Sequence, residues 1–183
     1  MAMPTSSGCH QGCRYCFYND TSSESVVVNR QDSQQPEQIY LHFRQRGVSL
    51  LQLVPLVEWD ERGMLTAESV EPKAWGAFLT ALFDIWVRED IERVHIRLFD
   101  VVLDAWCGRS QPWDKLTLSA NCRSCSVFRF CHGDCPEHQD ESGESVLCAG
   151  YRAFISYSAP YMRVMRDLIR QHRSPAELMA MLR

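Results

Sequence analysis

The chain has 183 residues, of which 45% are hydrophobic, and its formal net charge is −4. This length allows one or two packed cores, but a complete eight-stranded α/β barrel needs roughly 200 residues or more. The acidic balance argues against nucleic acid as a main partner, and the apolar runs are short and interrupted by charge, so no membrane-spanning helix is expected.

After the amino-terminal cysteines, strand and helix patterns alternate along the chain. The β-branched run at 26–28 predicts a buried strand, residues 34–46 predict a helix, and residues 49–54 predict a second buried strand. Pro36 suits the first turn of this helix, and Gly47 suits its end. A strand–helix–strand unit with this spacing predicts that the two strands are parallel.

The strongest helical pattern begins at Pro72. Its apolar residues recur at helical spacing on one face, at Trp75, Phe78, Leu79, Leu82, Phe83 and Trp86. We interpret this face as core packing against a sheet and not as a cofactor site. Residues 93–98 predict a third strand, and residues 99–106 predict a further helix.

The last third of the chain has a different composition. Residues 108–120 are polar and predict a boundary, which divides the chain into units at 1–107 and 108–183. Residues 121–147 are rich in cysteine and turn residues but poor in apolar ones, so this segment needs a metal or a cluster to hold it. The end is helical, with an apolar stripe at Tyr161, Val164, Met165 and Leu168.

The nine cysteines fall into two groups, at 9–16 and at 122–148, with Cys107 between them. Residues 1–12 lack the apolar segment of a secretory signal, which predicts a cytoplasmic location. Thiols stay reduced in the cytoplasm, so we interpret the cysteines as ligands and not as disulfides.

The first group has the spacing C-x3-C-x2-C, at Cys9, Cys13 and Cys16. Three thiolates can bind three irons of a four-iron cluster, which leaves the fourth iron open to an exogenous ligand. The alternatives are a zinc site and unligated thiols, but zinc sites usually carry paired C-x2-C knuckles, which this group lacks.

The second group comprises Cys122, Cys125, Cys131, Cys135 and Cys148. Four of these thiolates can close a four-iron cluster with no open position, of the kind that is structural or passes electrons. Tetrahedral zinc is an equal competitor on spacing alone, because C-x2-C knuckles also favour zinc.

These motifs resemble those of a known family. The first group, with Tyr15 before its third cysteine, resembles the signature of radical S-adenosylmethionine (SAM) enzymes, and the second resembles the carboxy-terminal half of a SPASM domain. Nearly the whole chain is similar to the anaerobic sulfatase-maturating enzymes. The similar blocks are residues 3–18, 26–30, 47–58, 75–87, 131–136 and 148–162.

The resemblance implies an α/β fold, namely a partial, incomplete radical SAM barrel of parallel βα units with a small cysteine-rich SPASM-like module and carboxy-terminal helices. It implies two [4Fe–4S] clusters, one of the SAM type and one auxiliary, with SAM bound at the open iron. By this match Tyr15 lies near the adenine and Tyr18 near the substrate. The auxiliary cluster is ligated by Cys122, Cys125, Cys131 and Cys148, whereas Cys135 matches the last ligand of a further auxiliary cluster.

The family oxidises a cysteine or serine of a sulfatase to Cα-formylglycine, which implies a sulfatase-like polypeptide and an electron donor as partners. This chain departs from the family in two places. Between Tyr18 and Val26 the relatives carry several barrel strands and a Gly-Gly-Glu-Pro motif that binds SAM. Between Cys107 and Cys122 they carry further cluster ligands and the aspartate proposed as the catalytic base, and neither Asp100 nor Asp104 matches it.

Three hypotheses follow. The chain is a radical SAM oxidoreductase of the sulfatase-maturase type, or a non-catalytic iron–sulfur protein that binds a partner, or an interaction module stabilised by zinc at residues 122–148. Reductive cleavage of SAM separates the first from the second, and metal analysis identifies the third.

Overall fold

A small parallel sheet lies at the centre of the fold. The computed structural model describes residues 24–109 and 118–183. Within this part of the chain, three parallel strands pair in the order β1 (Glu24–Val28), β2 (Leu50–Pro55) and β3 (His95–Ile96). The predicted α/β class and the parallel pairing of the first two strands are therefore confirmed.

The connection from β1 to β2 follows the sequence pattern. A short 3-10 turn, η2 (Asp32–Gln34), leads into helix α1 (Pro36–Gln45), with the predicted Pro36 at its first position. The helix ends before Gly47, whose φ of +73° is a conformation that glycine adopts without steric cost. The predicted helix at 34–46 is confirmed.

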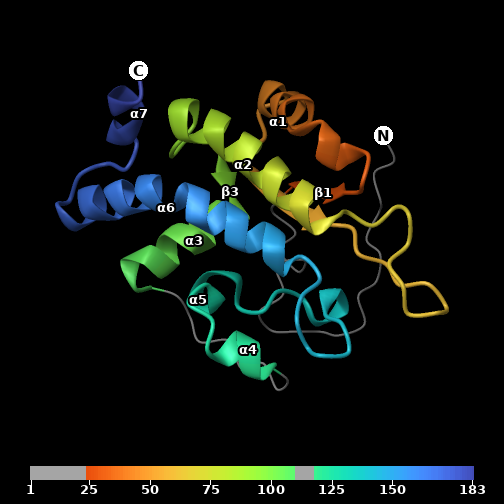
Figure 1. Cartoon of the computed structure of the whole chain (residues 1–183). Helices are drawn as coiled ribbons and strands as arrows, with labels where there is room; N and C mark the ends of the chain where they lie inside the picture. Colours follow the sequence, from red (N-terminus) through yellow and green to blue (C-terminus); the bar gives the residue numbers. More distant parts are fainter. Residues whose placement is uncertain (1–23, 110–117) are drawn as a thin grey trace.

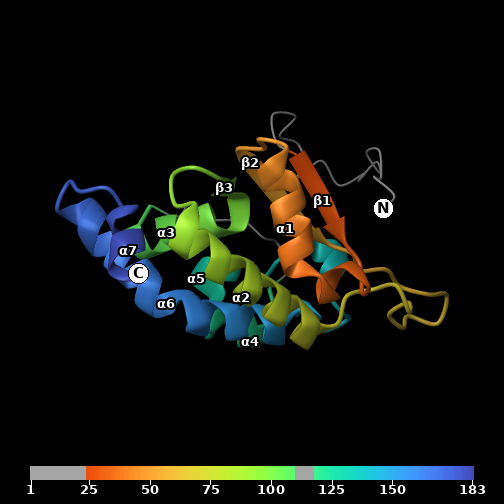
Figure 2. The same ribbon diagram turned by 90° about the horizontal axis from the view of Figure 1, so that it is seen from above.

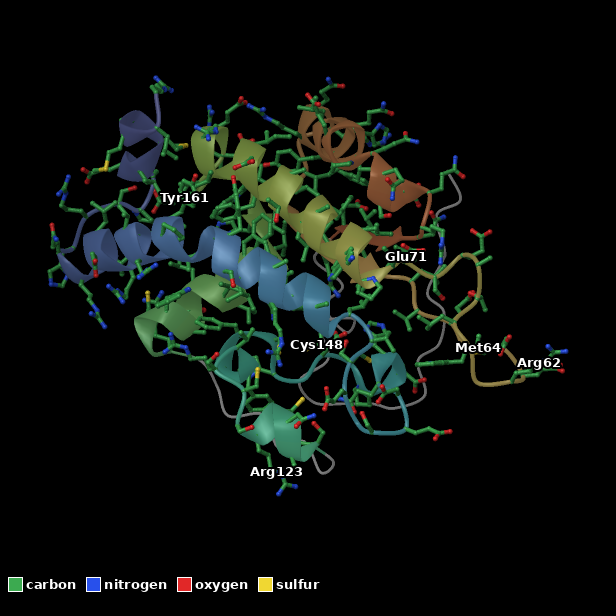
Figure 3. The ribbon with its side chains drawn as sticks, viewed as in Figure 1. Arg62, Met64, Glu71, Arg123, Cys148 and Tyr161 are labelled. Atoms are coloured by element: carbon green, nitrogen blue, oxygen red, sulfur yellow. The ribbon has the colours of Figure 1, made fainter. Side chains whose placement is uncertain are left out.

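Helix α2 (Pro72–Glu89) connects β2 to β3 and supplies much of the core. All six apolar residues of its predicted stripe are buried. Before α2, residues 56–71 form an irregular loop, and Figure 3 shows Arg62 and Met64 at its outer end. Trp59 of this loop donates a hydrogen bond from Nε1 to the carbonyl oxygen of Glu137 at 3.0 Å, which ties the loop to the cysteine-rich segment.

The third strand is shorter than the sequence suggested. Residues 93–98 were expected to be extended, but β3 covers two residues and helix α3 (Arg97–Cys107) begins directly after it. The reason is that Phe99, Val102 and Ala105 recur at helical spacing and are all buried, so burial favours a helix from this point. The predicted helix at 99–106 is confirmed and begins two residues earlier.

Short elements and one long helix make up the last third. They are α4 (Ala120–Arg123), α5 (Phe128–Cys131), the 3-10 turn η3 (Pro136–His138), α6 (Cys148–Arg170) and α7 (Glu177–Met181). The predicted helical stripe is confirmed for Met165 and Leu168, which are buried, but it is wrong for Val164, which is 37% exposed. The inward face of α6 is instead shifted to Met162, Met165 and Leu168, at three-residue spacing.

Helix α6 packs against α2 at a pair of glycines. A Cβ atom added to Gly76 would lie 2.9 Å from the Cα of Gly150, and one added to Gly150 would lie 2.3 Å from the carbonyl oxygen of Pro72. The two helix backbones therefore approach so closely that neither position has room for a side chain. This contact positions the beginning of α6, where Cys148 lies.

The core joins the sheet to the carboxy-terminal helices. Figures 1 and 2 show α2 between α1 and α6, and Figure 1 shows α4 and α5 below α3. Phe83 of α2, Phe99 of α3 and Phe154 of α6 form a mutual aromatic cluster with ring centroids 5.2–5.8 Å apart. Within residues 24–109 and 118–183, no helix is long and apolar enough to cross a bilayer.

The division of the chain into two units at residue 107 stays a prediction.

Candidate functional site

Four cysteines of the second group line one hollow. They are Cys122 of α4, Cys125 just after it, Cys131 at the end of α5 and Cys148 at the beginning of α6. Figure 3 shows Cys148 at the end of α6 that faces α4 and α5. The other residues that line the hollow are Asn121, Val127, Phe128, Glu144, Tyr151 and Arg152.

Local hydrogen bonds hold α4 beside the segment that leads into α6. Ser119 caps α4, because its Oγ accepts a hydrogen bond from the backbone N–H of Cys122 at 3.0 Å. Glu144 accepts hydrogen bonds on Oε1 from Ser119 Oγ at 3.3 Å and from Asn121 Nδ2 at 2.6 Å. These contacts connect the elements that carry Cys122 and Cys148.

Asp134 organises the loop that follows Cys131. Its Oδ2 accepts a hydrogen bond from Ser145 Oγ at 2.8 Å and lies 3.0 Å from His138 Nδ1, and its Oδ1 accepts from the Tyr151 hydroxyl at 3.1 Å. Burial acts to raise the pKa of this carboxyl, but the His138 ring and the hydrogen bonds from His138 and Ser145 outweigh it and hold the pKa below its usual range. Asp134 is therefore a charged acceptor that fastens the loop to α6.

The surroundings of the Cys131 thiol shift its pKa. Burial raises its pKa to about 11, and the nearby Asp134, Cys148 and Cys125 add to the rise, while a backbone hydrogen bond from Gly133 opposes it. At neutral pH this thiol is protonated in the metal-free chain. A metal ligated by Cys131 would displace that proton.

Arg152 brings positive charge to the hollow. Its Nε donates a hydrogen bond to Cys148 Sγ at 3.3 Å. The pKa of this guanidinium is raised by that hydrogen bond first, and then by the charges of Cys148, Cys125 and Cys131. The arginine is exposed and contacts the Cys148 thiol directly.

The four thiols line one hollow. Within the described ranges 24–109 and 118–183, no three His, Cys, Asp or Glu side chains form a group that could hold a single metal ion. A four-iron cluster has a different requirement, because each of its four cysteines binds a different iron. The donor set of four thiols around one hollow fits such a cluster.

The remaining described cysteines lie elsewhere. Cys135 precedes η3 and is not among the residues that line the hollow. Cys107 ends α3, where burial raises the pKa of its thiol, and the nearby charges are those of Arg109, Asp104, Arg170 and Arg166. The assignment of Cys135 to a further cluster stays a prediction.

Asp100 and Asp104 of α3, neither of which matches the family's catalytic base, each have a polar partner. Asp100 Oδ2 lies 3.2 Å from His95 Nδ1, and burial raises the pKa of Asp100, although the His95 ring opposes the rise. Asp104 forms an ion pair with Arg109 at 2.8 Å.

The predicted ligands and aromatic residues of the first motif lie outside the described residues. These are Cys9, Cys13, Cys16, Tyr15 and Tyr18. Within the described part, sequence reasoning missed Asp134 and Arg152. Arg152 had a detectable signal, because it follows Cys148 by four residues in a helical pattern, whereas Asp134 had only its place between two cysteines.

The known proteins similar to this chain include one of similar length and others that are about twice as long. No family model matches the chain. The chain is 52% identical to the uncharacterized protein YidF of Escherichia coli K12 over 158 residues, which covers 86% of this chain and 91% of YidF.

Longer relatives are sulfatase-maturating enzymes. The chain is 24% identical over 234 residues to the serine-type anaerobic sulfatase-maturating enzyme of Bacteroides thetaiotaomicron, covering 86% of this chain and 56% of that enzyme. It is 22% identical over 197 residues to the cysteine-type enzyme of Clostridium perfringens, covering 73% of this chain and 53% of that enzyme. The chain thus spans about half the length of these maturases. The 234-residue alignment exceeds the 183 residues of the chain, so the Bacteroides enzyme carries extra residues within the matched region.

Solved structures show the same fold. Native anSMEcpe with bound AdoMet has a TM-score of 0.65 and 21% identity, over 80% of this chain and 57% of that one. The complex of anSMEcpe with AdoMet and the Cp18Cys peptide has a TM-score of 0.66 and 20% identity, over 79% of this chain and 58% of that one. The small parallel sheet with its helices therefore matches part of the radical SAM fold. The chain belongs to the same family as YidF, and it is similar in sequence and fold to part of the longer anaerobic sulfatase-maturating enzymes.

Proposed function

We propose that this chain is a radical SAM iron–sulfur protein with two [4Fe–4S] clusters. One cluster is held by Cys122, Cys125, Cys131 and Cys148, and the other by the motif Cys9-x3-Cys13-x2-Cys16. The observation that carries this proposal is the hollow lined by four thiols from three separate helical segments. These four are the ones that the family resemblance assigns to one cluster.

We propose a cluster in preference to zinc because the family resemblance assigns these four cysteines to one cluster. Zinc draws four sulfurs to bond lengths of about 2.3 Å around one ion, so the sulfurs must converge. In a four-iron cluster each sulfur meets its own iron, so the ligands stay apart around the cluster. The cysteines here line one hollow, and a residue with positive charge, Arg152, lies beside them.

The proposed activity resembles that of the longer relatives. Three thiolates at Cys9, Cys13 and Cys16 leave an iron open for SAM, and Tyr15 is proposed to lie near its adenine. A cluster held by these three cysteines would supply the electron for reductive cleavage of SAM. The proposed substrate is a cysteine or serine of a sulfatase-like polypeptide near Tyr18, with a separate electron donor in the cytoplasm.

A non-catalytic iron–sulfur protein is the second candidate. The observation that favours it is size, because the chain spans about half of the maturases and its described sheet has three strands. In this candidate the hollow still holds its cluster, but SAM is not cleaved.

One experiment separates the two candidates. The full chain is reconstituted with iron and sulfide without oxygen, its metals are counted, and electron paramagnetic resonance (EPR) spectra of the reduced sample are recorded with and without SAM. The proposal predicts about eight irons per chain, a spectrum that changes when SAM is added, and 5′-deoxyadenosine as a product. About four irons with no spectral change and no 5′-deoxyadenosine would contradict the enzyme and favour the second candidate.

A further inference from the structure

The backbone of α6 directs Arg152 toward the hollow. Cys148 is the first residue of this helix, and Arg152 lies one turn further along. Side chains in a helix lean toward its amino terminus, so an arginine at this position reaches back over the preceding turn. The observed contact agrees, because Arg152 Nε lies 3.3 Å from Cys148 Sγ.

Arg152 lies at the same hollow as all four thiols. It is among the residues that line the hollow, together with Cys122, Cys125, Cys131 and Cys148. The hydrogen bond to Cys148 comes from Nε, so the guanidinium stays beside the thiols.

We infer that Arg152 is a positioning residue that raises the reduction potential of the cluster in this hollow, by donating a hydrogen bond to Cys148 and by placing positive charge beside the ligands. This inference rests on the proposed function. A cluster that takes one electron from an external reductant gains one negative charge, while no bond forms or breaks and no proton moves. Positive charge and hydrogen bonds to the sulfurs stabilise the reduced form more than the oxidised form, so the potential rises.

Arg123 provides a matched control. It also lies next to a cysteine of the hollow, Cys122, and it is exposed. Figure 3 shows its side chain directed outward from α4, on the side away from Cys148. Loss of this arginine changes the charge of the protein by the same amount without removing a contact to a ligand sulfur.

The test is a redox titration of the full chain in a background with Cys9→Ser, Cys13→Ser and Cys16→Ser, which leaves the hollow as the proposed cluster site. Arg152→Gln, Arg152→Lys and Arg123→Gln are compared with this background. For each protein, iron is counted, and the reduced fraction is followed by EPR against a mediator series.

At a fixed potential near the midpoint, Arg152→Gln should lower the ratio of reduced to oxidised cluster by roughly three- to tenfold, and tenfold corresponds to about 59 mV for a one-electron couple. Arg152→Lys keeps the charge and should fall between the background and Arg152→Gln, whereas Arg123→Gln should match the background.

Two results would overturn the inference while the proposed function survives. In the first, every protein binds about four irons, and the clusters of Arg152→Gln and Arg123→Gln have the same reduction potential. The other is loss of iron from Arg152→Gln, because the arginine would then be needed to retain the cluster. A background protein that binds no iron would overturn both the inference and the proposed function.

Discussion

The contact between α2 and α6 offers a direct test of how the cysteine site is held in place. In Gly150→Ala, the new Cβ would lie 2.3 Å from the carbonyl oxygen of Pro72 and 3.0 Å from the backbone nitrogen of Gly76. Both atoms belong to the backbone, so no side-chain rotation can relieve the clash. The helices must move apart at the turn that follows Cys148.

The expected cost can be worked out from two opposing effects. Overpacking a close contact costs about 1–3 kcal/mol, whereas alanine gains up to about 1 kcal/mol over glycine in a helix interior. The very short distance to Pro72 places this substitution at the upper end, so we expect a net loss of about 1–2 kcal/mol. For a chain of this size that loss lowers the melting temperature by about 2–8 °C.

The assay compares thermal and urea unfolding of Gly150→Ala with those of Ser156→Ala. Ser156 lies on the exposed face of the same helix, and its substitution should change stability by less than about 0.5 kcal/mol. Reconstituted Gly150→Ala should also retain less iron than the control, since Cys148 lies two residues away. A Gly150→Ala protein as stable as the parent, with full iron content, would refute the reasoning that this backbone contact positions Cys148.

Two further predictions concern buried polar contacts. Asp134→Asn replaces the charged acceptor of Ser145 and Tyr151, so the free energy of unfolding in urea should fall by about 1.5–3 kcal/mol, and a change below about 0.5 kcal/mol would contradict the role of Asp134. Tyr40→Phe removes the hydroxyl that donates to Asp90 Oδ2 at 2.9 Å, which should cost about 1 kcal/mol at pH 7. Burial, followed by Asp90, raises the pKa of Tyr40, so the stability that depends on its neutral hydroxyl is full below about pH 10 and falls above it. Unfolding measured from pH 8 to 11 should therefore decline less steeply in Tyr40→Phe, and equal slopes would contradict this origin.

The sequence predicted helices α1 and α2 because the signals for them lie within a few residues of each other. Pro36 and Gly47 bracket α1, and the stripe that begins at Trp75 places α2 in the core, because proline, glycine and apolar spacing act over a few residues. The end of β3 was predicted poorly, since a strand of two residues is defined by its partner β2 and not by its own composition.

The candidate site was predictable in part. Cysteine spacing alone did not distinguish a zinc site from an iron–sulfur cluster. The family resemblance selected four cysteine ligands, and these four line one hollow in the structure. Tertiary contacts were beyond the sequence. The approach of Gly76 to Gly150 depends on how two distant helices cross, and the role of Asp134 depends on the loop that brings Ser145 and Tyr151 to one carboxylate.

The metal content of the hollow is the most direct test of the central claim. In the background with Cys9→Ser, Cys13→Ser and Cys16→Ser, the full chain is purified without oxygen, reconstituted, and analysed for iron, sulfide and zinc. The account predicts about four irons and four sulfides per chain, lost on Cys148→Ser and retained on Cys107→Ser, whose thiol lies outside the hollow. One zinc per chain without iron, or equal iron in the Cys148→Ser and Cys107→Ser proteins, would contradict it.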